Sequence, residues 1–442
     1  MPELEEFLNG RIWLRNFTPF SEDLINEAIA KGFITVTNGI ADGHICARCL
    51  EKSPHKIISF YCSNCDANCL YCRHCIKMGR VSSCTELITW KTTSSIPSQN
   101  HLFSWNGTLT ALQQRASAEV SSSLSNGKSH LVYAVCGAGK TELLFTPIFE
   151  ALQKGQRVCI AAPRTDVVLE LSPRIKATFP NTIVHTLYGG APIETGFSNI
   201  VIATTHQLYR FQEAFDVMIV DEADAFPYSY DPALERAVIK AKKKEAPIVY
   251  VSATPSAALL KKVENRSEIF RRFHGHALPV PVFEPLWNYK KVLFKNKIPP
   301  KLAKWVQDKL SKNEPFLLFL PTIELIVHSI KLFQELDPRI EAVHAQDPER
   351  KEKVLKLRNG EVRGLLTSTI LERGITIPNV QVAVVGADDR IFEASALIQI
   401  AGRAGRAAAN PKGDVVFFHD GIVREMDRAR QKILSYNRRG LP

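Results

Sequence analysis

Short apolar runs recur along the chain from about residue 130 onward, and stretches with helical character separate them. Runs that are apolar at every position are typical of parallel strands covered on both faces, because neither face then meets water. Strands that alternate with helices predict an α/β fold with doubly wound parallel sheets. The predicted strands fall into two sets: 131–135, 157–162, 200–203, 217–221 and 247–252, then 315–320, 364–368, 381–386 and 413–418.

The region between the two sets, about 255–310, is rich in lysine and proline and shows no convincing series of strands. We therefore interpret this region as the join between two separate sheets. A length of 442 residues is also ample for about three domains. The predicted order is an N-terminal segment, a cysteine module, a linker and two α/β domains, at 1–45, 46–84, 85–105, 106–275 and 276–442.

A glycine-rich turn follows the first predicted strand, and residues 134–141 read Ala-Val-Cys-Gly-Ala-Gly-Lys-Thr. Gly137 and Gly139 allow backbone N–H groups to approach a phosphate group closely, and the next helix presents its partly positive N-terminus. Lys140 can then reach the β- and γ-phosphates, and Thr141 can hold Mg²⁺ through its hydroxyl. The turn therefore predicts a binding site for a nucleoside triphosphate.

The predicted strand at 217–221 ends in a pair of carboxylates, Asp221 and Glu222. We expect Asp221 to hold Mg²⁺, partly through water, and Glu222 to orient and deprotonate the attacking water. Together with the glycine-rich turn, these residues predict nucleotide hydrolysis and not only nucleotide binding.

A third segment, 399–406, reads Gln-Ile-Ala-Gly-Arg-Ala-Gly-Arg. A spacing of three predicts that Arg403 and Arg406 lie on one face of a helix. Guanidinium groups suit a triphosphate because they donate two parallel hydrogen bonds. Since these arginines belong to the second set of strands, we expect the nucleotide to bind between the two sheets, with Arg406 stabilising transition-state charge.

In order and spacing, these segments resemble the motifs of superfamily 2 helicases over roughly residues 105–442. The resemblance implies two RecA-like domains, ATP and Mg²⁺ as cofactors, and nucleic acid as a partner. The matching segments are Gln113, which would read adenine, and 134–141, 163–165, 204–207, 221–224, 252–254, 368–376 and 399–406. The candidate catalytic residues are Lys140, Asp221, Glu222, Arg403 and Arg406, and the candidate cofactor-binding residues are Gln113, Gly137, Ala138, Gly139, Lys140, Thr141, Asp221 and Gln399.

Eight of the ten cysteines lie between residues 46 and 84. In a cytosolic chain this density is typical of metal ligation and not of disulfides. Two Cys-x₂-Cys pairs, 46/49 and 62/65, have zinc-ribbon spacing. The other four are Cys69, Cys72, Cys75 and Cys84. Eight thiols could serve two ions, or two of the three Cys-x₂-Cys pairs could hold one.

The cysteine module ends Tyr-Cys-Arg-His-Cys-Ile-Lys-Met-Gly-Arg at 71–80 and precedes a motor that contains Ile-Leu-Glu-Arg-Gly at 370–374. This combination resembles the ComFA family of late-competence ATPases over essentially the whole chain. The resemblance implies a translocase that uses ATP to bring single-stranded DNA through the membrane channel during transformation. It also implies a companion protein of the ComFC type and a four-cysteine zinc site, with Cys46 and Cys49 joined by the 62/65 or the 72/75 pair.

A net charge of +11 favours a polyanionic partner. No apolar run approaches the ~18 residues of a membrane helix, and the N-terminus lacks a signal-peptide pattern. These features predict a cytoplasmic protein, and the resemblance adds docking at the inner face of the cell membrane.

Two other functions remain open from the sequence. The first is a duplex-unwinding helicase similar to the replication-restart type, which also carries cysteine pairs. In that type the cysteines interrupt the motor, whereas here they precede it. The second is a nucleic-acid-binding scaffold that uses ATP only as a conformational clamp, and ATP turnover with and without DNA distinguishes it from a motor.

Overall fold

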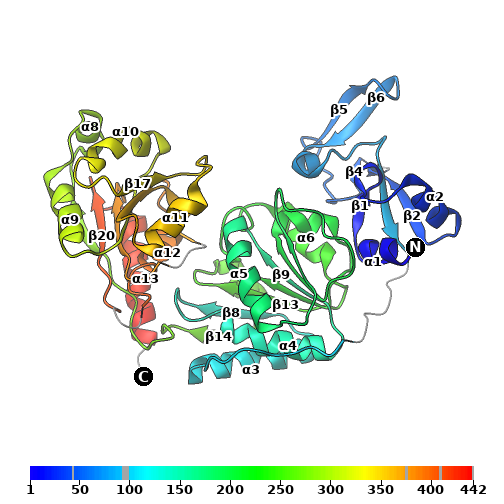
Figure 1. The fold of residues 1–442 in the computed structure, drawn as a ribbon, viewed down its shortest axis with the longest axis horizontal. Coiled ribbons are helices and arrows are strands. Elements are labelled where there is room, and N and C mark those ends of the chain that lie inside the picture. Colours follow the sequence, from blue (N-terminus) through cyan, green and yellow to red (C-terminus); the bar gives the residue numbers. More distant parts are fainter. Residues whose placement is uncertain (42–43, 92–98, 374–376, 408–410, 441–442) are drawn as a thin grey trace. The chain divides into compact units, whose positions relative to one another are not determined.

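The computed structural model describes residues 1–41, 44–91, 99–373, 377–407 and 411–440. The chain divides into two compact units (Figure 1). The first comprises Met1–Val132 and Thr141–Ser267, and the second comprises Tyr133–Lys140 and Glu268–Pro442.

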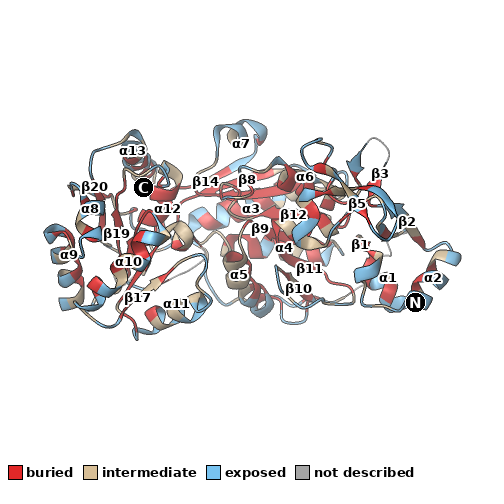
Figure 2. Cartoon of the chain, turned by 90° about the horizontal axis from the view of Figure 1, so that it is seen from above, coloured by how far each residue is buried: buried red, intermediate tan, exposed pale blue. Residues whose placement is uncertain are grey.

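The larger sheet has seven strands in the order β10-β11-β9-β12-β13-β8-β14, and β10, β11, β9, β12 and β13 pair in parallel. All residues of β9, β11, β12 and β13 are buried (Figure 2). The strands are β8 (His130–Ala134), β9 (Val158–Ala162), β10 (Val184–Leu187), β11 (Ile200–Thr204), β12 (Val217–Val220), β13 (Ile248–Ser252) and β14 (Arg266–Ile269). The helices here are α3 (Ala111–Ser125), α4 (Phe145–Gln153), α5 (Thr165–Thr178), α6 (Pro232–Ala241) and α7 (Ala257–Lys262).

The second sheet has six strands in the order β15-β20-β19-β16-β18-β17, and every neighbouring pair is parallel. Its core includes Phe316 and Leu318 from β16 and Phe333 from α10. The strands are β15 (Val282–Pro285), β16 (Phe316–Phe319), β17 (Ile340–Val343), β18 (Gly364–Thr367), β19 (Gln381–Val385) and β20 (Val415–His419). The helices are α8 (Tyr289–Phe294), α9 (Pro300–Ser311), α10 (Ile323–Gln334), α11 (Arg350–Asn359), α12 (Ala394–Ala401) and α13 (Arg424–Arg439). The prediction of two doubly wound parallel sheets is confirmed.

The N-terminal residues form a small sheet of their own, in which β1 and β2 both pair antiparallel with β7. Leu4, Phe7, Trp13, Ile25 and Ile88 pack in its core. The elements are α1 (Pro2–Leu8), β1 (Ile12–Leu14), α2 (Glu22–Ala30), β2 (Ile34–Asn38) and β7 (Glu86–Trp90). Strand β7 falls in the predicted linker 85–105, so that interpretation was wrong for residues 86–90. Residues 92–98 lie outside the described chain.

The cysteine-rich residues lie between β2 and β7 of this small sheet. They form the pairs β3–β4 and β5–β6 and a short 3₁₀ helix, η2. The bounds are β3 (Ile40–Ala41), β4 (Ile45–Cys46), β5 (Ile57–Cys62), β6 (Ala67–Cys72) and η2 (Arg73–Met78). In Figure 1 the β5–β6 hairpin projects from the other N-terminal elements.

Residues 255–310 show no convincing series of strands in the sequence, but two short strands lie there, β14 in the first sheet and β15 in the second. Both are edge strands of their sheets, and β15 has no fully buried residue. In the described residues, no helix is both long and apolar enough to cross a membrane.

Candidate nucleotide and zinc sites

The phosphate loop follows β8 and contains two glycines in the left-handed backbone region. The φ angle is 80° at Gly137 and 70° at Gly139, a conformation that glycine adopts without a Cβ penalty. The Lys140 ammonium donates hydrogen bonds to the carbonyl oxygens of Ala134 and Val135, at 3.3 and 3.5 Å. The loop therefore has the backbone that a phosphate cradle needs, and the Lys140 side chain folds back to the start of the loop.

The acidic pair follows β12 in the first unit. The Glu222 backbone N–H donates to Asp221 Oδ1 at 2.9 Å. Glu222 has a φ of 51°, which is uncommon outside glycine. Such conformations persist where surrounding structure holds them, and they cluster at functional sites. The backbone after β12 therefore holds the Asp221 and Glu222 carboxylates in a defined arrangement.

Asp224 links this acidic segment to residues 252–254. Its carboxylate accepts hydrogen bonds from Ser252 Oγ at 2.5 Å and from Thr254 Oγ1 at 2.6 Å. Charge-assisted hydrogen bonds of this kind are stronger than neutral ones. A shift of the acidic segment would therefore move residues 252–254 with it.

The second unit places the two candidate arginines beyond a helix, so the prediction that they share a helical face was wrong. Helix α12 ends at Ala401, and Gly405 has a left-handed φ of 65°. Arg403 is buried, and its Nε donates to the Glu372 carbonyl at 2.9 Å. Arg406 is only half-buried, and its Nε donates to the Gly402 carbonyl at 3.0 Å. The glycines end the helix, and the two arginines have different surroundings.

Arg272 is a residue of the second unit that the sequence analysis missed. Its side-chain stem lies against Gly137, and its Nη1 donates to the Gly405 carbonyl. Burial, together with the nearby charge of Arg406, lowers the pKa of Arg272 to about 10. Among the described residues, no hydrogen-bond partner meets its buried Nε and Nη2 atoms. No motif marks this arginine; only its position beside the phosphate loop does.

The other predicted nucleotide residues are already engaged within the protein. Gln113 is buried at the start of α3, where its Oε1 accepts the Thr110 N–H at 2.8 Å. Gln399 Oε1 accepts the Cys136 thiol at 2.7 Å. Thr141 Oγ1 accepts a hydrogen bond from Arg174, also in the first unit, at 3.4 Å.

The two segments that resemble nucleic-acid contacts lie at strand ends of the larger sheet. Residues 163–165 follow β9, and 204–207 run from the end of β11 into the 3₁₀ helix η4 (Thr205–Arg210). Residues 374–376, the last part of the 368–376 segment, lie outside the described residues.

The eight clustered cysteines form two groups of four, each with all sulfur atoms within 4.8 Å of one another. The first group is Cys46, Cys49, Cys72 and Cys75, and the second is Cys62, Cys65, Cys69 and Cys84. Of the two pairings left open for Cys46 and Cys49, the structure brings the 72/75 pair to them. The 62/65 pair lies in the other group.

The first group has the dimensions of a zinc–thiolate site. The sulfur atoms of Cys46 and Cys75 are 3.8 Å apart, and those of Cys49 and Cys72 are 3.5 Å apart. Four Zn–S bonds of ~2.3 Å in a tetrahedron place sulfurs about 3.8 Å apart. All four cysteines are buried, so this group fits a closed, structural zinc site.

Comparison with known proteins places all three parts of the chain. Residues 1–89 match the competence protein ComFA N-terminal domain, 110–263 match the DEAD/DEAH box helicase domain, and 299–408 match the helicase conserved C-terminal domain. Competence protein ComFA of Bacillus subtilis strain 168 is 43% identical over 442 residues, which cover 98% of this chain and 95% of the relative. The chain belongs to the ComFA family.

A second ComFA protein, from Streptococcus pneumoniae, is 37% identical over 397 residues, with 86% of this chain and 90% of the relative covered. Among solved structures, S. cerevisiae Dbp5 bound to RNA and ADP BeF3 has a TM-score of 0.56 at 18% identity and covers 74% of this chain and 88% of its own. Mycobacterium smegmatis helicase Lhr bound to ssDNA and AMP-PNP also has a TM-score of 0.56, at 17% identity, covering 76% of this chain and 50% of its own. These structures show the fold, two RecA-like domains. The helicase domains and the ComFA relatives make the chain an ATP-hydrolysing enzyme of superfamily 2, and they imply ATP and Mg²⁺.

In this ComFA-family chain, a buried arginine offsets the negative charge of the first cysteine group. Four thiolates around a divalent ion carry a net charge of about −2. Arg48 is 2% exposed, and its Nε lies 3.4 Å from Cys75 Sγ. Its other nitrogens donate to the carbonyls of Cys75, Met78 and Gly79, at 3.0, 3.0 and 2.6 Å. Arg48 therefore supplies positive charge and holds η2 against the cysteines.

The first group is also attached to the motor through α6 and η4. The Lys240 ammonium donates to the Arg48 carbonyl and, at 3.0 Å, to the Tyr209 carbonyl in η4. Arg236 donates to Glu51 Oε2 at 2.9 Å. Burial acts to raise the pKa of Glu51, but the Ser53 N–H and Arg236 outweigh it and hold that pKa below its ordinary value.

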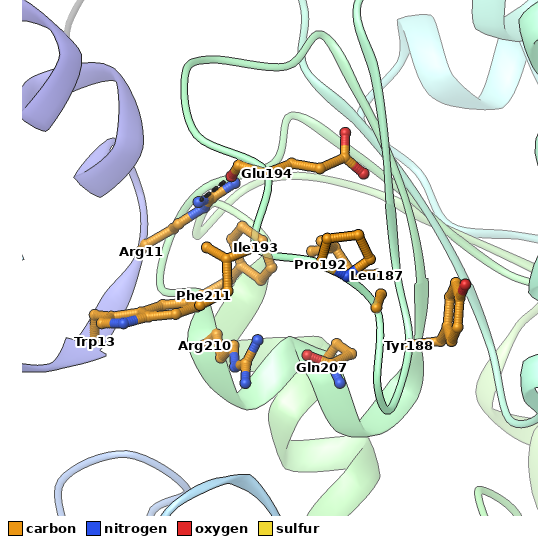
Figure 3. Close-up of a pocket in the computed structure, with 11 residues that line it drawn as sticks. Arg11, Trp13, Leu187, Tyr188, Pro192, Ile193, Glu194, Gln207, Arg210 and Phe211 are labelled. Atoms are coloured by element: carbon orange, nitrogen blue, oxygen red, sulfur yellow. Dashed lines mark hydrogen bonds between the residues drawn. The ribbon is translucent and has the colours of Figure 1, made fainter. Parts of the chain in front are cut away.

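The small N-terminal sheet also contacts the motor part of the first unit, in part through Arg210 of η4. Arg11 Nη1 donates to the Glu194 carbonyl at 3.2 Å in the pocket of Figure 3. The Arg210 guanidinium lies 4.5 Å from the centre of the Trp13 ring, and cation–π contacts of this kind are attractive. Buried Arg157 donates to the Asn9 carbonyl at 2.9 Å. These contacts could not be predicted from the sequence, because each joins residues that are far apart in the chain.

Proposed function

We propose that the chain is an ATP-driven translocase of single-stranded DNA that drives DNA uptake during competence and transformation. The observation that carries this proposal is the full-length relation to ComFA proteins, with both the N-terminal domain and the motor included. The attachment of the cysteine module at η4 supports it, because η4 contains most of a segment that resembles a nucleic-acid contact.

In the proposed nucleotide site, the phosphate loop from Gly137 to Lys140 binds the phosphates, with Ala138 between its glycines. Thr141 and Asp221 would hold Mg²⁺, and the ion would supply positive charge beside the phosphates. Glu222 accepts the proton of the attacking water. Gln113 and Gln399 complete the nucleotide contacts.

Arginines of the second unit supply positive charge for the transition state. We propose Arg406 as the arginine finger, because its side chain is half-exposed and it directly follows the turn at 402–405. Arg403 is buried on the Glu372 carbonyl and holds the segment in place. Arg272 lies beside Gly137, and among the described residues its buried Nε and Nη2 atoms have no hydrogen-bond partner. N–H groups on two neighbouring nitrogens suit a phosphate group.

The proposed substrate strand runs along residues 163–165 and 204–207. Contacts to phosphates position a strand without reading its sequence, and the net charge of +11 favours such a partner. The proposed protein partners are a ComFC-type protein and the DNA-uptake channel, which would place the motor at the inner face of the cell membrane.

Displacement of streptavidin from the end of a biotinylated single strand tests translocation directly. We expect displacement that requires hydrolysable ATP and that the Glu222→Gln variant does not perform. Strand separation of a duplex without any displacement would instead support a duplex-unwinding helicase.

We expect the double variant Cys46→Ser, Cys49→Ser to lose zinc from the first group and to disorder the part of the cysteine module that this group holds together, β4 and η2. The module is too small to hold its own core, so metal binding and folding are coupled. ATP binding should stay largely intact, because the proposed nucleotide residues all lie beyond residue 105. DNA-stimulated turnover should fall, because the module is attached at η4.

The matched control is Cys159→Ala, which removes a buried thiol of β9 far from both groups in sequence. Zinc content, basal turnover and DNA-stimulated turnover should be measured on both proteins. Unchanged DNA stimulation and unchanged partner binding in protein that lacks zinc in the first group would contradict the proposed role of the module. Loss of ATP binding would mean that the module is an integral part of the motor fold.

A further inference from the structure

The second group of cysteines has the geometry of a metal site but a different location from the first. Cys62 ends β5, Cys69 lies in β6, and Cys84 precedes β7. The Cys62 and Cys84 sulfurs are 3.8 Å apart, the edge length of a tetrahedral zinc–thiolate site. All four sulfurs, including that of Cys65, lie within 4.8 Å of one another. None of the four is in a disulfide.

We propose that Cys62, Cys65, Cys69 and Cys84 bind a second zinc ion, independent of the ion in the first group. The two groups are interleaved along the chain: the first joins Cys46 and Cys49 to Cys72 and Cys75, and the second joins Cys62, Cys65 and Cys69 to Cys84. Four thiolates close the coordination sphere and leave no position for a substrate, so the second site is structural.

The backbone around Cys62 is already arranged as a zinc knuckle. The Cys65 N–H donates to the Cys62 carbonyl oxygen, with an N···O distance of 3.2 Å. The turn closes at Asp66, whose φ is 50°. On the other side, Ser82 Oγ lies 3.3 Å from the Cys84 sulfur. Hydrogen bonds to ligand atoms orient them and spread their charge, as outer partners do in known metal sites.

The hairpin needs such an ion because it has little apolar core. Isolated two-stranded hairpins are marginally stable in water. In β5 and β6 the buried residues are Ile57 and three cysteines (Cys62, Cys69 and Cys72), and Tyr61 is 65% exposed. Further support comes from an edge-to-face contact between Phe60 and Tyr71, from Arg80 over the Phe60 ring, and from backbone hydrogen bonds of β6 to residues 81–83. A second ion would connect both strands to the segment before β7.

The two sites differ in their surroundings, which makes them separable by experiment. The residues that contact α6, Arg48 and Glu51, accompany the first group. The second group lies on the hairpin that projects in Figure 1, and its Cys65 and Cys84 are exposed. We therefore expect the second ion to leave first when a chelator is added, and its loss to spare the attachment to the motor.

Zinc content per chain tests the proposal. Purified wild-type protein should contain two zinc ions, Cys62→Ser with Cys84→Ser should retain one, and Cys46→Ser with Cys49→Ser should retain one. The control Cys159→Ala should retain two. The proposal would be overturned if the wild type held one ion and the Cys62/Cys84 variant kept it. Loss of both ions from either variant would also overturn it.

A measurement on the unaltered chain covers the case in which a variant fails to fold. A colorimetric chelator should remove zinc from wild-type protein in two phases of equal amplitude, fast for the exposed site and slow for the buried one. Substitution with cobalt should give a thiolate-to-metal absorption band twice as intense as that of a single four-thiolate site. A single phase that releases one ion, or a band of single intensity, would contradict a second site.

Discussion

The Glu222→Gln variant is expected to bind ATP and to turn it over at least roughly 10²-fold more slowly than the wild type. A general base contributes about 10² to 10⁴ to a rate, and glutamine keeps the size and hydrogen bonding of Glu222 without its basicity. The left-handed backbone at this position should tolerate the change, because glutamine has the same branching at Cβ. Turnover and the affinity for a fluorescent ATP analogue should both be measured.

Lys140→Ala provides the contrast, because it removes a phosphate contact and should weaken ATP binding as well as turnover. Glu245→Gln is a suitable control, since Glu245 is exposed in a turn of the first unit. Wild-type turnover in Glu222→Gln would show that another group deprotonates the water, and the assignment of the acidic segment would be wrong.

Arg406→Ala is expected to leave ATP affinity within a few-fold of the wild type and to reduce turnover by roughly 10³ or more. This is the range associated with arginine fingers, which act on charge that develops only in the transition state. The Arg406 side chain is half-exposed and its Nε donates to the nearby Gly402 carbonyl, so its removal should disturb the fold little. Steady-state turnover and thermal unfolding of the same preparation separate the two effects.

Arg424→Ala serves as the control, because Arg424 begins α13 in the same unit and belongs to no predicted site. Near-normal turnover in Arg406→Ala would mean that Arg403 or Arg272 supplies the charge instead. Those two are buried, so their substitutions should also lower the unfolding temperature, which Arg406→Ala should not.

The sheets were predictable where their strands are central. All nine strands predicted from continuous apolar runs are present, because a central parallel strand is covered on both faces. The four strands that were missed in the two large sheets are β10, β14, β15 and β17, and these are the four edge strands. An edge strand is less covered than a central one and can contain polar residues. Strand β14 contains Arg266 and Glu268, so no continuous apolar run marks it.

The candidate site divides in the same way. The phosphate loop and the acidic pair follow from local sequence, because each function needs particular residues at short spacing. The end of α12 at Ala401 was missed although Gly402 and Gly405 follow it, because the spacing of the arginines suggested a longer helix. Arg272 and the contacts of the cysteine module with α6 could not be predicted, since they depend on residues that meet only in the folded chain.

The central claim is that the chain is an ATPase whose turnover is stimulated by single-stranded DNA. The most direct test is ATP turnover measured alone and with single-stranded DNA, duplex DNA or RNA, at one fixed salt concentration because backbone binding depends strongly on salt. The account predicts low basal turnover, strong stimulation by single-stranded DNA, and weaker stimulation by duplex DNA or RNA. Equal turnover with and without DNA, or stimulation by RNA alone, would contradict it.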